Sequence, residues 1–444
     1  MRTKRGRPHE HPRVAILTLG CAKNLVDSEH IASLVEAAGA EVCADPARAS
    51  VVVVNTCGFI EAAKQESIDA VLEVSALKEA GGLRTLIVTG CLSQRYGEEL
   101  KRLLPEADVL MGIDPEGAAR AALQALGLAS PPVCNPRAHR LTPRAWTYLR
   151  ISEGCDNRCA YCAIPSIRGP LASRPLEEVV REARGLIESG AREINIIAQD
   201  TTAYGADRGP QELHELLRRL CALDGDFWLR LLYTHPAHYY DELIAVLAGE
   251  PRICPYLDIP LQHVSDRILK RMGRKVSRRD IERLIETLRA RIPALTLRTT
   301  FMVGFPGETD NEFRELLEFV EAMRFDRLGA FAYSQEEGTR AARMGGQVPQ
   351  RQRRERYHLL MALQADIARE LAAARVGERT RALVEEGARK DRPWAVARGP
   401  REAPDTDPVI LVRDAPRLKP GDVAEVEIVG SDGYDCVARR VEIF

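Results

Sequence analysis

The sequence lacks any apolar run long enough to form a membrane-spanning segment. Its longest apolar pieces, such as "VAILTLG" and "VVVVN", have the length of strands, whereas a transmembrane helix needs about 18 or more consecutive apolar residues. The basic stretch "MRTKRGRPHEHPR" also lacks the apolar segment of a signal peptide, and we expect it to be an irregular tail. These absences predict a soluble, cytoplasmic protein.

A net charge is also nearly absent, because 63 basic side chains face 64 acidic ones and leave a formal charge of -1. No field of one sign would attract the chain to a phosphate backbone, which disfavours a dedicated nucleic-acid binder. At about 100–200 residues per domain, 444 residues predict two or three domains. The 11 cysteines, in a chain without an export signal, favour metal-binding or catalytic thiols over disulfides.

Over residues 13–113, short apolar runs alternate with longer helical stretches. This alternation predicts a doubly wound parallel sheet. Cys21, Cys57 and Cys91 each follow one of its first three strands, "RVAILTL", "SVVVVNT" and "LRTLIVTG". Because parallel strands share one carboxyl edge, we expect these cysteines to meet there as a metal site. The alternative is that they are ordinary buried thiols at strand ends.

A second series of strands and helices begins at "TYLRISEG", after a proline-rich link. Its six strand-like runs predict a partial (β/α) barrel, whose active site lies at the carboxyl ends of the strands. The motif "CDNRCAYC", with Cys155, Cys159 and Cys162, follows the first of these strands. The cysteine motif therefore lies where barrel chemistry takes place.

The spacing C-x-x-x-C-x-x-C supplies three thiolates and no fourth ligand. Structural zinc sites are normally closed by four ligands, and no further Cys or His stands at zinc-finger spacing. Thiolates also hold four-iron four-sulfur clusters, and three of them leave one iron open to substrate or cosubstrate. A zinc-stabilised binding module and a non-catalytic iron-sulfur electron carrier remain as alternatives.

With this motif the chain resembles the radical S-adenosylmethionine superfamily, and within it the methylthiotransferases, which carry three more cysteines in a flavodoxin-like domain. The closest resemblance is to the members that methylthiolate an aspartate of ribosomal protein S-twelve. The segments that carry it are "LGCAKNLVDSE", "NTCGFI", "GCLSQRY", "RGPLASRP", "AQDTTAYG", "DIPLQHVSDRILKRMGR" and "GFPGETDNEF".

This resemblance implies two 4Fe-4S clusters with separate tasks. The cluster on Cys155, Cys159 and Cys162 would pass one electron to S-adenosylmethionine, and the 5'-deoxyadenosyl radical would take a hydrogen from the aspartate β-carbon. The cluster on Cys21, Cys57 and Cys91 would carry the sulfur, methylated by a second S-adenosylmethionine. A low-potential donor such as a flavodoxin would supply the electron.

The resemblance also suggests which residues contact S-adenosylmethionine. They belong to the second and fifth strands of the predicted barrel, either within the strand or at its end: Gln199, Asp200, Arg298, Gly304 and Glu308. Two alternatives stay open. Gly304 and Gly307 could simply make a turn around Pro306, and Arg298 could be an ion-paired residue of the barrel.

From about residue 376, five short strand-like runs bounded by Gly, Pro and Asp predict a small β-barrel, which resembles a TRAM domain. Residues 376–444 hold 12 Lys and Arg against 14 Asp and Glu. That balance fits a basic ribosomal protein better than an RNA. The stretch "AVARGPREAPDTDPVI" resembles the turn of such domains, except that Pro408 stands where glycine is expected.

Three domains are therefore predicted. They are a methylthiotransferase domain with the auxiliary cluster over residues 12–127, a radical S-adenosylmethionine barrel over 141–375, and a TRAM-like barrel over 376–444. The alternative substrate is the isopentenyladenosine of tRNA, but Asp258 and His263 in "DIPLQHVSD" favour the ribosomal-protein branch. The remaining cysteines are expected to be ordinary thiols: Cys43, Cys134, Cys221, Cys254 and Cys436.

Overall fold

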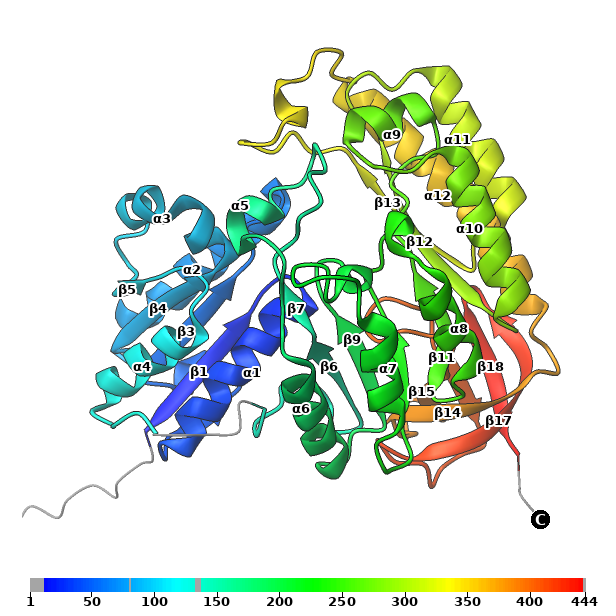
Figure 1. The fold of residues 1–444 in the computed structure, drawn as a ribbon. Coiled ribbons are helices and arrows are strands. Elements are labelled where there is room, and N and C mark those ends of the chain that lie inside the picture. Colours follow the sequence, from blue (N-terminus) through cyan, green and yellow to red (C-terminus); the bar gives the residue numbers. More distant parts are fainter. Residues whose placement is uncertain (1–11, 80, 132–136, 442–444) are drawn as a thin grey trace, which may run out of the picture. The chain divides into compact units, whose positions relative to one another are not determined.

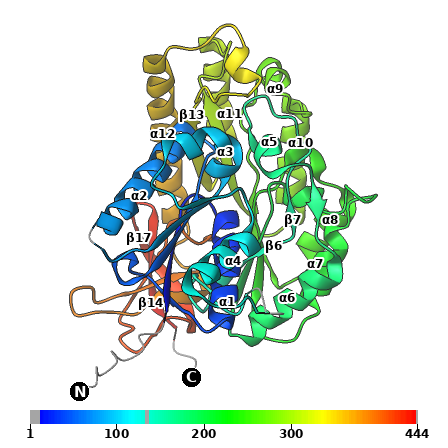
Figure 2. The ribbon, with the colours of Figure 1, turned by 90° about the vertical axis from the view of Figure 1, so that its left-hand side faces the viewer.

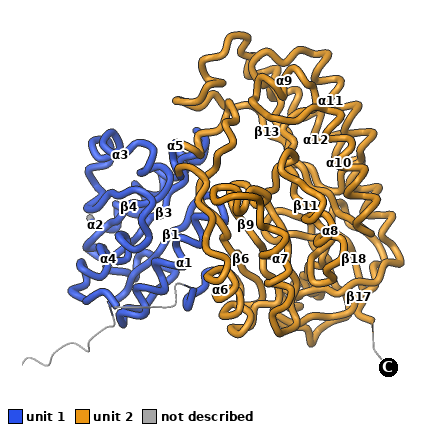
Figure 3. Tube along the Cα trace, viewed as in Figure 1, with its two compact units in different colours: residues 1–141, 166–168 blue, residues 142–165, 169–444 orange. Residues whose placement is uncertain are grey.

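The computed structural model describes residues 12–79, 81–131 and 137–441. It divides into two compact units, unit 1 with residues 1–141 and 166–168 and unit 2 with residues 142–165 and 169–444 (Figure 3). Of the predicted irregular tail, residues 1–13, the first 11 lie outside the described residues, as does Cys134, and Arg13 already belongs to the first strand. Within the described ranges, no helix combines the length and the apolar character needed to cross a membrane.

Unit 1 is built on a sheet of parallel strands in the order β2-β1-β3-β4-β5. This is the strand order of flavodoxin-like folds, and it confirms the predicted doubly wound sheet. The three-residue edge strand β2 was not predicted, because it is too short to show a pattern. The elements are β1 (Arg13–Thr18), α1 (Ala22–Ala37), β2 (Glu41–Cys43), β3 (Val51–Thr56), α2 (Glu61–Glu79), β4 (Thr85–Gly90), α3 (Cys91–Leu103), β5 (Val109–Leu110) and α4 (Pro115–Leu126).

Alternate residues of the central strand β3 belong to two different cores. Val51 and Val53 pack with residues of α1 and α4, whereas Val52 and Val54 pack with residues of α2 and α3. Helices therefore cover both faces of the sheet (Figure 1). This explains the uninterrupted valine run, since a strand buried on both faces needs no polar alternation.

Unit 2 begins with a six-stranded parallel sheet in the order β13-β12-β11-β10-β9-β6. Helices α6, α7, α8 and α10 follow one another along one side of it (Figure 2), and the fold is the predicted partial (β/α) barrel. The elements are β6 (Trp146–Arg150), α6 (Leu176–Glu188), β9 (Glu193–Ile197), α7 (Leu213–Cys221), β10 (Trp228–Leu231), α8 (Asp241–Gly249), β11 (Ile253–Asp258), α9 (Asp266–Met272), α10 (Arg278–Arg291), β12 (Thr296–Val303), α11 (Asp310–Met323) and β13 (Arg327–Ala332).

The long helix α12 (Gln350–Ala373) precedes a closed barrel with the strand order β14-β15-β16-β18-β17. Its core is apolar and includes Val384, Val412 and Ile428, which are fully buried. The structure confirms the small C-terminal barrel. Its strands are β14 (Arg379–Glu386), β15 (Ala395–Arg398), β16 (Ile410–Arg413), β17 (Val423–Asp432) and β18 (Asp435–Arg440).

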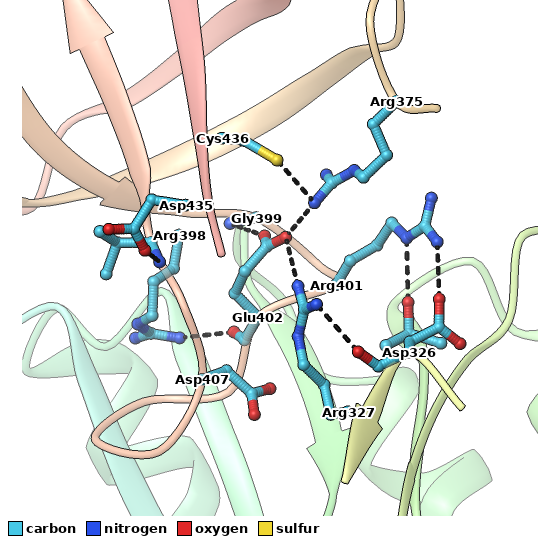
Figure 4. Close-up of polar contacts among 12 residues, drawn as sticks. Asp326, Arg327, Arg375, Arg398, Gly399, Arg401, Glu402, Asp407, Asp435 and Cys436 are labelled. Carbon is cyan, nitrogen blue, oxygen red and sulfur yellow. Dashed lines mark hydrogen bonds and ion pairs between the residues drawn. The ribbon is translucent and has the colours of Figure 1, made fainter. Parts of the chain in front are cut away.

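The turn after β15 is occupied by a buried ion network within unit 2 (Figure 4). Glu402 is 1% exposed, and its carboxylate pairs with Arg375 and lies 3.8 Å from Arg327, the first residue of β13. Arg401 donates to the hydroxyl of Thr296, the first residue of β12, at 2.9 Å. The turn "AVARGPREAPDTDPVI" therefore packs against the amino ends of the sheet, which leaves the carboxyl ends to the functional residues.

Candidate functional site

Unit 1 brings Cys21, Cys57 and Cys91 to the carboxyl edge of its sheet. Cys21 is the N-cap of α1, Cys57 follows β3, and Cys91 is the first residue of α3. A Cβ atom built on Gly20 would lie 2.9 Å from the sulfur of Cys57, which shows how closely the first two loops approach. Burial raises the pKa of Cys91 to about 11, and the charges of Cys21 and Cys57 add to the rise. The three thiols therefore lie close enough for the charge of one to affect the pKa of another.

A glycine before Cys91 makes this approach possible. Gly90 has φ +101, and a Cβ atom there would lie 2.5 Å from the Oδ1 atom of Asn55 and from the carbonyl oxygen of Thr56. No side chain fits at that position, and the backbone conformation itself favours glycine. Gly90 thus lets β4 pass close to β3 at the point where a cysteine follows each strand.

A buried cation stands beside these three thiols. Arg168, which the division assigns to unit 1, donates to the Oδ1 atom of Asn24 at 2.7 Å and to the carboxylate of Asp27 at 3.1 Å. The thiol of Cys91 lies 3.6 Å from the same Oδ1 atom, and the charge of Arg168 acts to lower the pKa of Cys91. A positive charge next to three thiols fits a group that is bound by thiolates.

The spacing of the thiols bears on the zinc alternative. A single zinc ion with Zn–S bonds of about 2.3 Å requires sulfurs within about 4.6 Å of one another. In the described part of the chain, no three cysteine sulfurs lie within 4.8 Å of one another. Both cysteine sets are therefore more open than a mononuclear site, and they fit a larger group such as an iron-sulfur cluster.

The second cysteine set lies on one loop of unit 2, which is closed at its base. Strand β7 (Ser152–Glu153) pairs antiparallel with β8 (Ala172–Ser173), and the amide of Cys155 donates to the carbonyl of Gly169 at 3.1 Å. Gly154 has φ +70, and a Cβ atom there would lie 1.9 Å from the carbonyl oxygen of Pro170. Only glycine allows the two ends of the loop to approach this closely.

The outer part of the loop is held by backbone bonds to distant segments of unit 2. The amide of Ala160 donates to the carbonyl of Met272 at 2.7 Å, and the amide of Ala341 donates to the carbonyl of Ala160 at 2.8 Å. Both segments also share an apolar cluster with Ala160. The cysteines are therefore presented by a fixed loop.

The three cysteines of this loop are half-buried, and the surroundings of Cys155 and Cys162 disfavour their thiolate forms. Burial raises the pKa of Cys155 to about 11 and that of Cys162 to about 12. The amide of Ile164 donates to the sulfur of Cys162 at 3.4 Å, which is the kind of contact that stabilises a metal-bound thiolate. Bound iron would supply the missing positive charge, so these residues fit a cluster.

Asp200 is the centre of a polar network at the carboxyl end of β9. Its carboxylate accepts hydrogen bonds from Asn157 at 2.6 Å and from Thr202 at 2.6 Å, and it contacts the Nδ1 atom of His238 at 2.7 Å. Burial works to raise the pKa of Asp200, but the contact with His238, together with His235 and the hydrogen bond from Thr202, outweighs burial and holds the pKa below its usual value. Asn157 lies inside the cysteine loop, so Asp200 connects the strand end to that loop.

Gln199 is placed beside the same loop. Its Nε2 atom donates to the carboxylate of Glu153 at 2.6 Å, while its Oε1 atom is buried and has no hydrogen-bond partner among the described residues. An amide oxygen left in this way is available to a ligand. Gln199 and Asp200 thus place a free acceptor and an ionised carboxylate next to the three thiols.

The carboxylate of Glu308 binds the turn that contains Gly304. One carboxylate oxygen accepts from the amides of Gly304 and Phe305 at 2.7 and 3.2 Å, and the other pairs with Arg356 at 2.8 Å. The side chain is fully buried. Glu308 therefore stabilises the "GFPGE" turn. This turn follows β12 and places its own backbone at the end of that strand.

Arg298 lies at the third position of β12 and pairs with two carboxylates. Its guanidinium is 3.0 Å from Asp258 and 3.6 Å from Asp407. These contacts match the alternative of an ion-paired barrel residue. A role of Arg298 toward the nucleotide stays a prediction.

The two residues that favoured a ribosomal-protein substrate are both buried. Asp258 is 1% exposed and accepts from the amide of Tyr233, and His263 is fully buried with its Nδ1 atom accepting from the amide of Ser265. Neither side chain is available to touch a macromolecule. Any influence on substrate choice must act through the shape of the strand ends.

The sequence did not single out four residues that the structure places around the cysteine loop. They are Asn157, His235, His238 and Arg274. Asn157 stands inside the cysteine motif, and the two histidines follow β10 in "YTHPAH", at the same sheet edge as Asp200. Their position after a barrel strand was a usable signal. Arg274 is the last residue of "DIPLQHVSDRILKRMGR", one of the segments that carry the resemblance, but the sequence assigned it no role.

Three known families match consecutive parts of the chain. Residues 13–112 match Uncharacterized protein family UPF0004, residues 149–320 match the Radical SAM superfamily, and residues 376–441 match the TRAM domain. The matches follow the order of the flavodoxin-like sheet, the partial barrel and the closed barrel.

Curated relatives match over nearly the whole length. Three proteins named "Ribosomal protein uS12 methylthiotransferase RimO" are similar to this chain. The one from Desulforudis audaxviator is 47% identical and covers 97% of each chain. The one from Anaeromyxobacter sp. (strain Fw109-5) is 45% identical and covers 97% of this chain and 93% of its own. The one from Geobacter sulfurreducens is 44% identical, with 97% and 98% covered.

Solved structures share the fold at low identity. The radical S-adenosylmethionine methyltransferase TsrM from Kitasatospora setae superposes with a TM-score of 0.53 at 15% identity, over 73% of this chain and 75% of that one. The cobalamin-dependent S-adenosylmethionine radical enzyme OxsB gives a TM-score of 0.52 at 13% identity, over 81% and 56%. At such identities the likeness concerns the fold alone.

Proposed function

Because this chain belongs to the RimO family of ribosomal protein uS12 methylthiotransferases, we propose that it inserts a methylthio group at the β-carbon of an aspartate of uS12. The enzyme is a radical S-adenosylmethionine methylthiotransferase that uses S-adenosylmethionine and two 4Fe-4S clusters. The observation that carries the proposal is the presence of two separate three-cysteine sites, each beside a buried arginine.

In this proposal Cys155, Cys159 and Cys162 hold the catalytic cluster, and the loop ends keep that cluster at the carboxyl edge of the barrel. When bound, this cluster and S-adenosylmethionine supply a radical able to break an unactivated C–H bond, chemistry that no side chain provides. The auxiliary cluster is assigned to three ligands from unit 1: Cys21, Cys57 and Cys91.

The strand ends beside the cysteine loop are the proposed pocket for S-adenosylmethionine. The Oε1 atom of Gln199 would accept a hydrogen bond from the ligand, and the Asp200 carboxylate would face its positively charged groups. Glu308 would hold the turn from which the backbone of Gly304 reaches the ligand. Arg298 would act on the pocket through Asp258, at the end of β11.

The three matched regions support the proposed division into a methylthiotransferase domain over 12–127, a radical S-adenosylmethionine barrel over 141–375 and a TRAM-like barrel over 376–444. The nearly balanced charge of the last region supports a basic protein substrate. We also propose a cytoplasmic location and a low-potential electron donor such as a flavodoxin.

A competition assay tests the substrate. Protein reconstituted anaerobically with iron and sulfide receives S-adenosylmethionine, a reductant, a peptide from the aspartate loop of uS12 and isopentenyladenosine-containing tRNA. We expect a methylthio group on the peptide aspartate by mass spectrometry. A methylthio group on the adenosine alone would contradict the choice of substrate and leave the chemistry in place.

A further inference from the structure

Arg274 is a buried cation next to the cysteine loop of unit 2. It follows Gly273, the residue that ends α9, and it is 7% exposed. Its guanidinium donates to the hydroxyl of Tyr161 at 3.3 Å and to the carbonyl of Pro260 at 2.6 Å. Its Nε atom is buried and has no hydrogen-bond partner within the described ranges. The side chain is therefore held in place but only partly satisfied.

The other deeply buried arginines show what Arg274 lacks. Seven arginines of the described residues are buried, and in six of them the guanidinium forms an ion pair with a carboxylate. Arg274 has no such pair among the residues that the structure describes. A buried charge without a counter-ion costs several kcal/mol, so an arginine at this position calls for an anion. The six paired arginines are Arg137, Arg168, Arg230, Arg356, Arg375 and Arg398.

The groups around Arg274 identify that anion. Ala160 is bonded to Met272 through the backbone, and a Cβ atom on Gly273 would lie 2.9 Å from the carbonyl oxygen of Arg158. The segment before Arg274 therefore lies directly against the loop between the cysteines. The guanidinium itself contacts the hydroxyl of Tyr161, which stands between Cys159 and Cys162 in the cysteine motif. The candidate anions beside Arg274 are therefore the thiolates of this loop.

We propose that Arg274 is a positioning residue whose buried guanidinium balances the thiolates of Cys155, Cys159 and Cys162 and eases one-electron reduction of the iron-sulfur cluster held there. The inference rests on the proposed function of this site. It adds a residue that sets the redox behaviour of the cluster and that does not ligate it.

The sign of the effect follows from electrostatics. One-electron reduction adds a negative charge to a group that is already surrounded by three thiolates. A fixed cation nearby stabilises the reduced form more than the oxidised form, and in a buried site water screens the interaction only weakly. Cluster potentials respond to net charge and to hydrogen bonds at the sulfurs. Removing the charge of Arg274 therefore makes the cluster harder to reduce.

A redox titration tests this proposal. The background is C21A/C57A/C91A, so that the remaining cluster is the one on the loop, and its reduction is followed by electron paramagnetic resonance. At the wild-type midpoint we expect the ratio of reduced to oxidised cluster to fall about tenfold in Arg274→Gln, a shift of about 59 mV to more negative potential for one electron. Arg274→Lys keeps the charge and should stay close to the parent.

Arg340 provides the matched control. It is exposed, and it donates to the carbonyl of Arg158 on the same loop at 2.7 Å. Because water screens an exposed charge, Arg340→Gln should shift the potential less than Arg274→Gln. An unchanged midpoint in Arg274→Gln, or an equal shift in both variants, would overturn the proposal.

Two further outcomes keep the test decisive if Arg274→Gln binds iron poorly. Loss of iron that Arg274→Lys restores supports the role of the charge, whereas equal loss in both variants overturns it.

The melting temperature gives a second measurement. Its rise on cluster binding should be smaller in Arg274→Met than in the parent. An equal rise in melting temperature would contradict an interaction between the charge of Arg274 and the bound cluster. Iron that persists after Cys155→Ala in this background would instead disprove the proposed function of the site.

Discussion

The two proposed cluster sites each have three cysteines but are built in opposite ways. In unit 1, Cys21, Cys57 and Cys91 come from three strand ends, and only the parallel sheet brings them together. In unit 2, one loop carries all three cysteines and is closed at its base by β7 and β8. The first site therefore depends on the topology of a whole domain, and the second depends on a local loop and its anchors.

The buried arginines of the two sites differ in the same sense. Arg168 has its own carboxylate partner, Asp27, so its charge is balanced before any ligand binds. Arg274 has no carboxylate partner in the described part of the chain, and its balance is left to the ligand. This difference fits a first site that stores a group for transfer and a second site whose redox state must change.

The largest expected effect is from Cys159→Ala. Without this ligand the loop no longer holds its cluster, and formation of 5'-deoxyadenosine and of methylthiolated peptide should both stop. Both products are measured by mass spectrometry after anaerobic reconstitution. Continued formation of 5'-deoxyadenosine would disprove the assignment of the site.

Cys57→Ala should separate the activities of the two sites. Sulfur transfer should stop while cleavage of S-adenosylmethionine continues, because the loop of unit 2 is untouched. The same assay reports both products. If the variant still methylthiolates its peptide, the two sites do not divide the work in this way.

Arg168→Met tests the charge balance of the first site. It removes the charge-assisted contacts to Asn24 and Asp27, and we expect the apoprotein to lose about 2–3 kcal/mol of unfolding free energy. Chemical denaturation measures the loss. Unchanged stability would show that the buried pair contributes nothing to unit 1.

The glycines next to the cysteines give a smaller effect that is specific for each site. Gly90→Ala should lower iron binding at the first site, and Gly154→Ala should lower it at the second, each with a strain of about 1–3 kcal/mol. Gly185→Ala is the matched control. Gly185 lies inside α6 with no atom near a new Cβ, so alanine should stabilise by about 0.5–1 kcal/mol. Equal iron loss at both sites in either of the first two variants would contradict the separation.

The sequence predicted those features that leave a local pattern. Apolar runs located the strands of both parallel sheets and of the closed barrel, and the cysteines marked the ends of the strands. The edge strand β2 left no pattern, because three residues cannot show an alternation. Nor does local sequence reveal that β18 lies between β16 and β17, since that order depends on long-range pairing.

Prediction of the functional site from the sequence has similar limits. The position of Asp200 after β9 was visible in the sequence, but its partners His238 and Asn157 come from other segments. Arg274 ends the segment "DIPLQHVSDRILKRMGR", but nothing in that segment showed that its charge lies beside the cysteine loop. What distinguishes it is the absence of a carboxylate partner in the described structure, and a missing contact can be recognised only in three dimensions.

The most direct test of two independent sites is the iron content of three variants. The variants are C21A/C57A/C91A, C155A/C159A/C162A and the combination of both, each reconstituted anaerobically beside the unchanged protein. We predict that each triple variant retains half of the iron and sulfide and that the combined variant retains none. A triple variant that loses all of its iron, or none, would contradict the division into two sites.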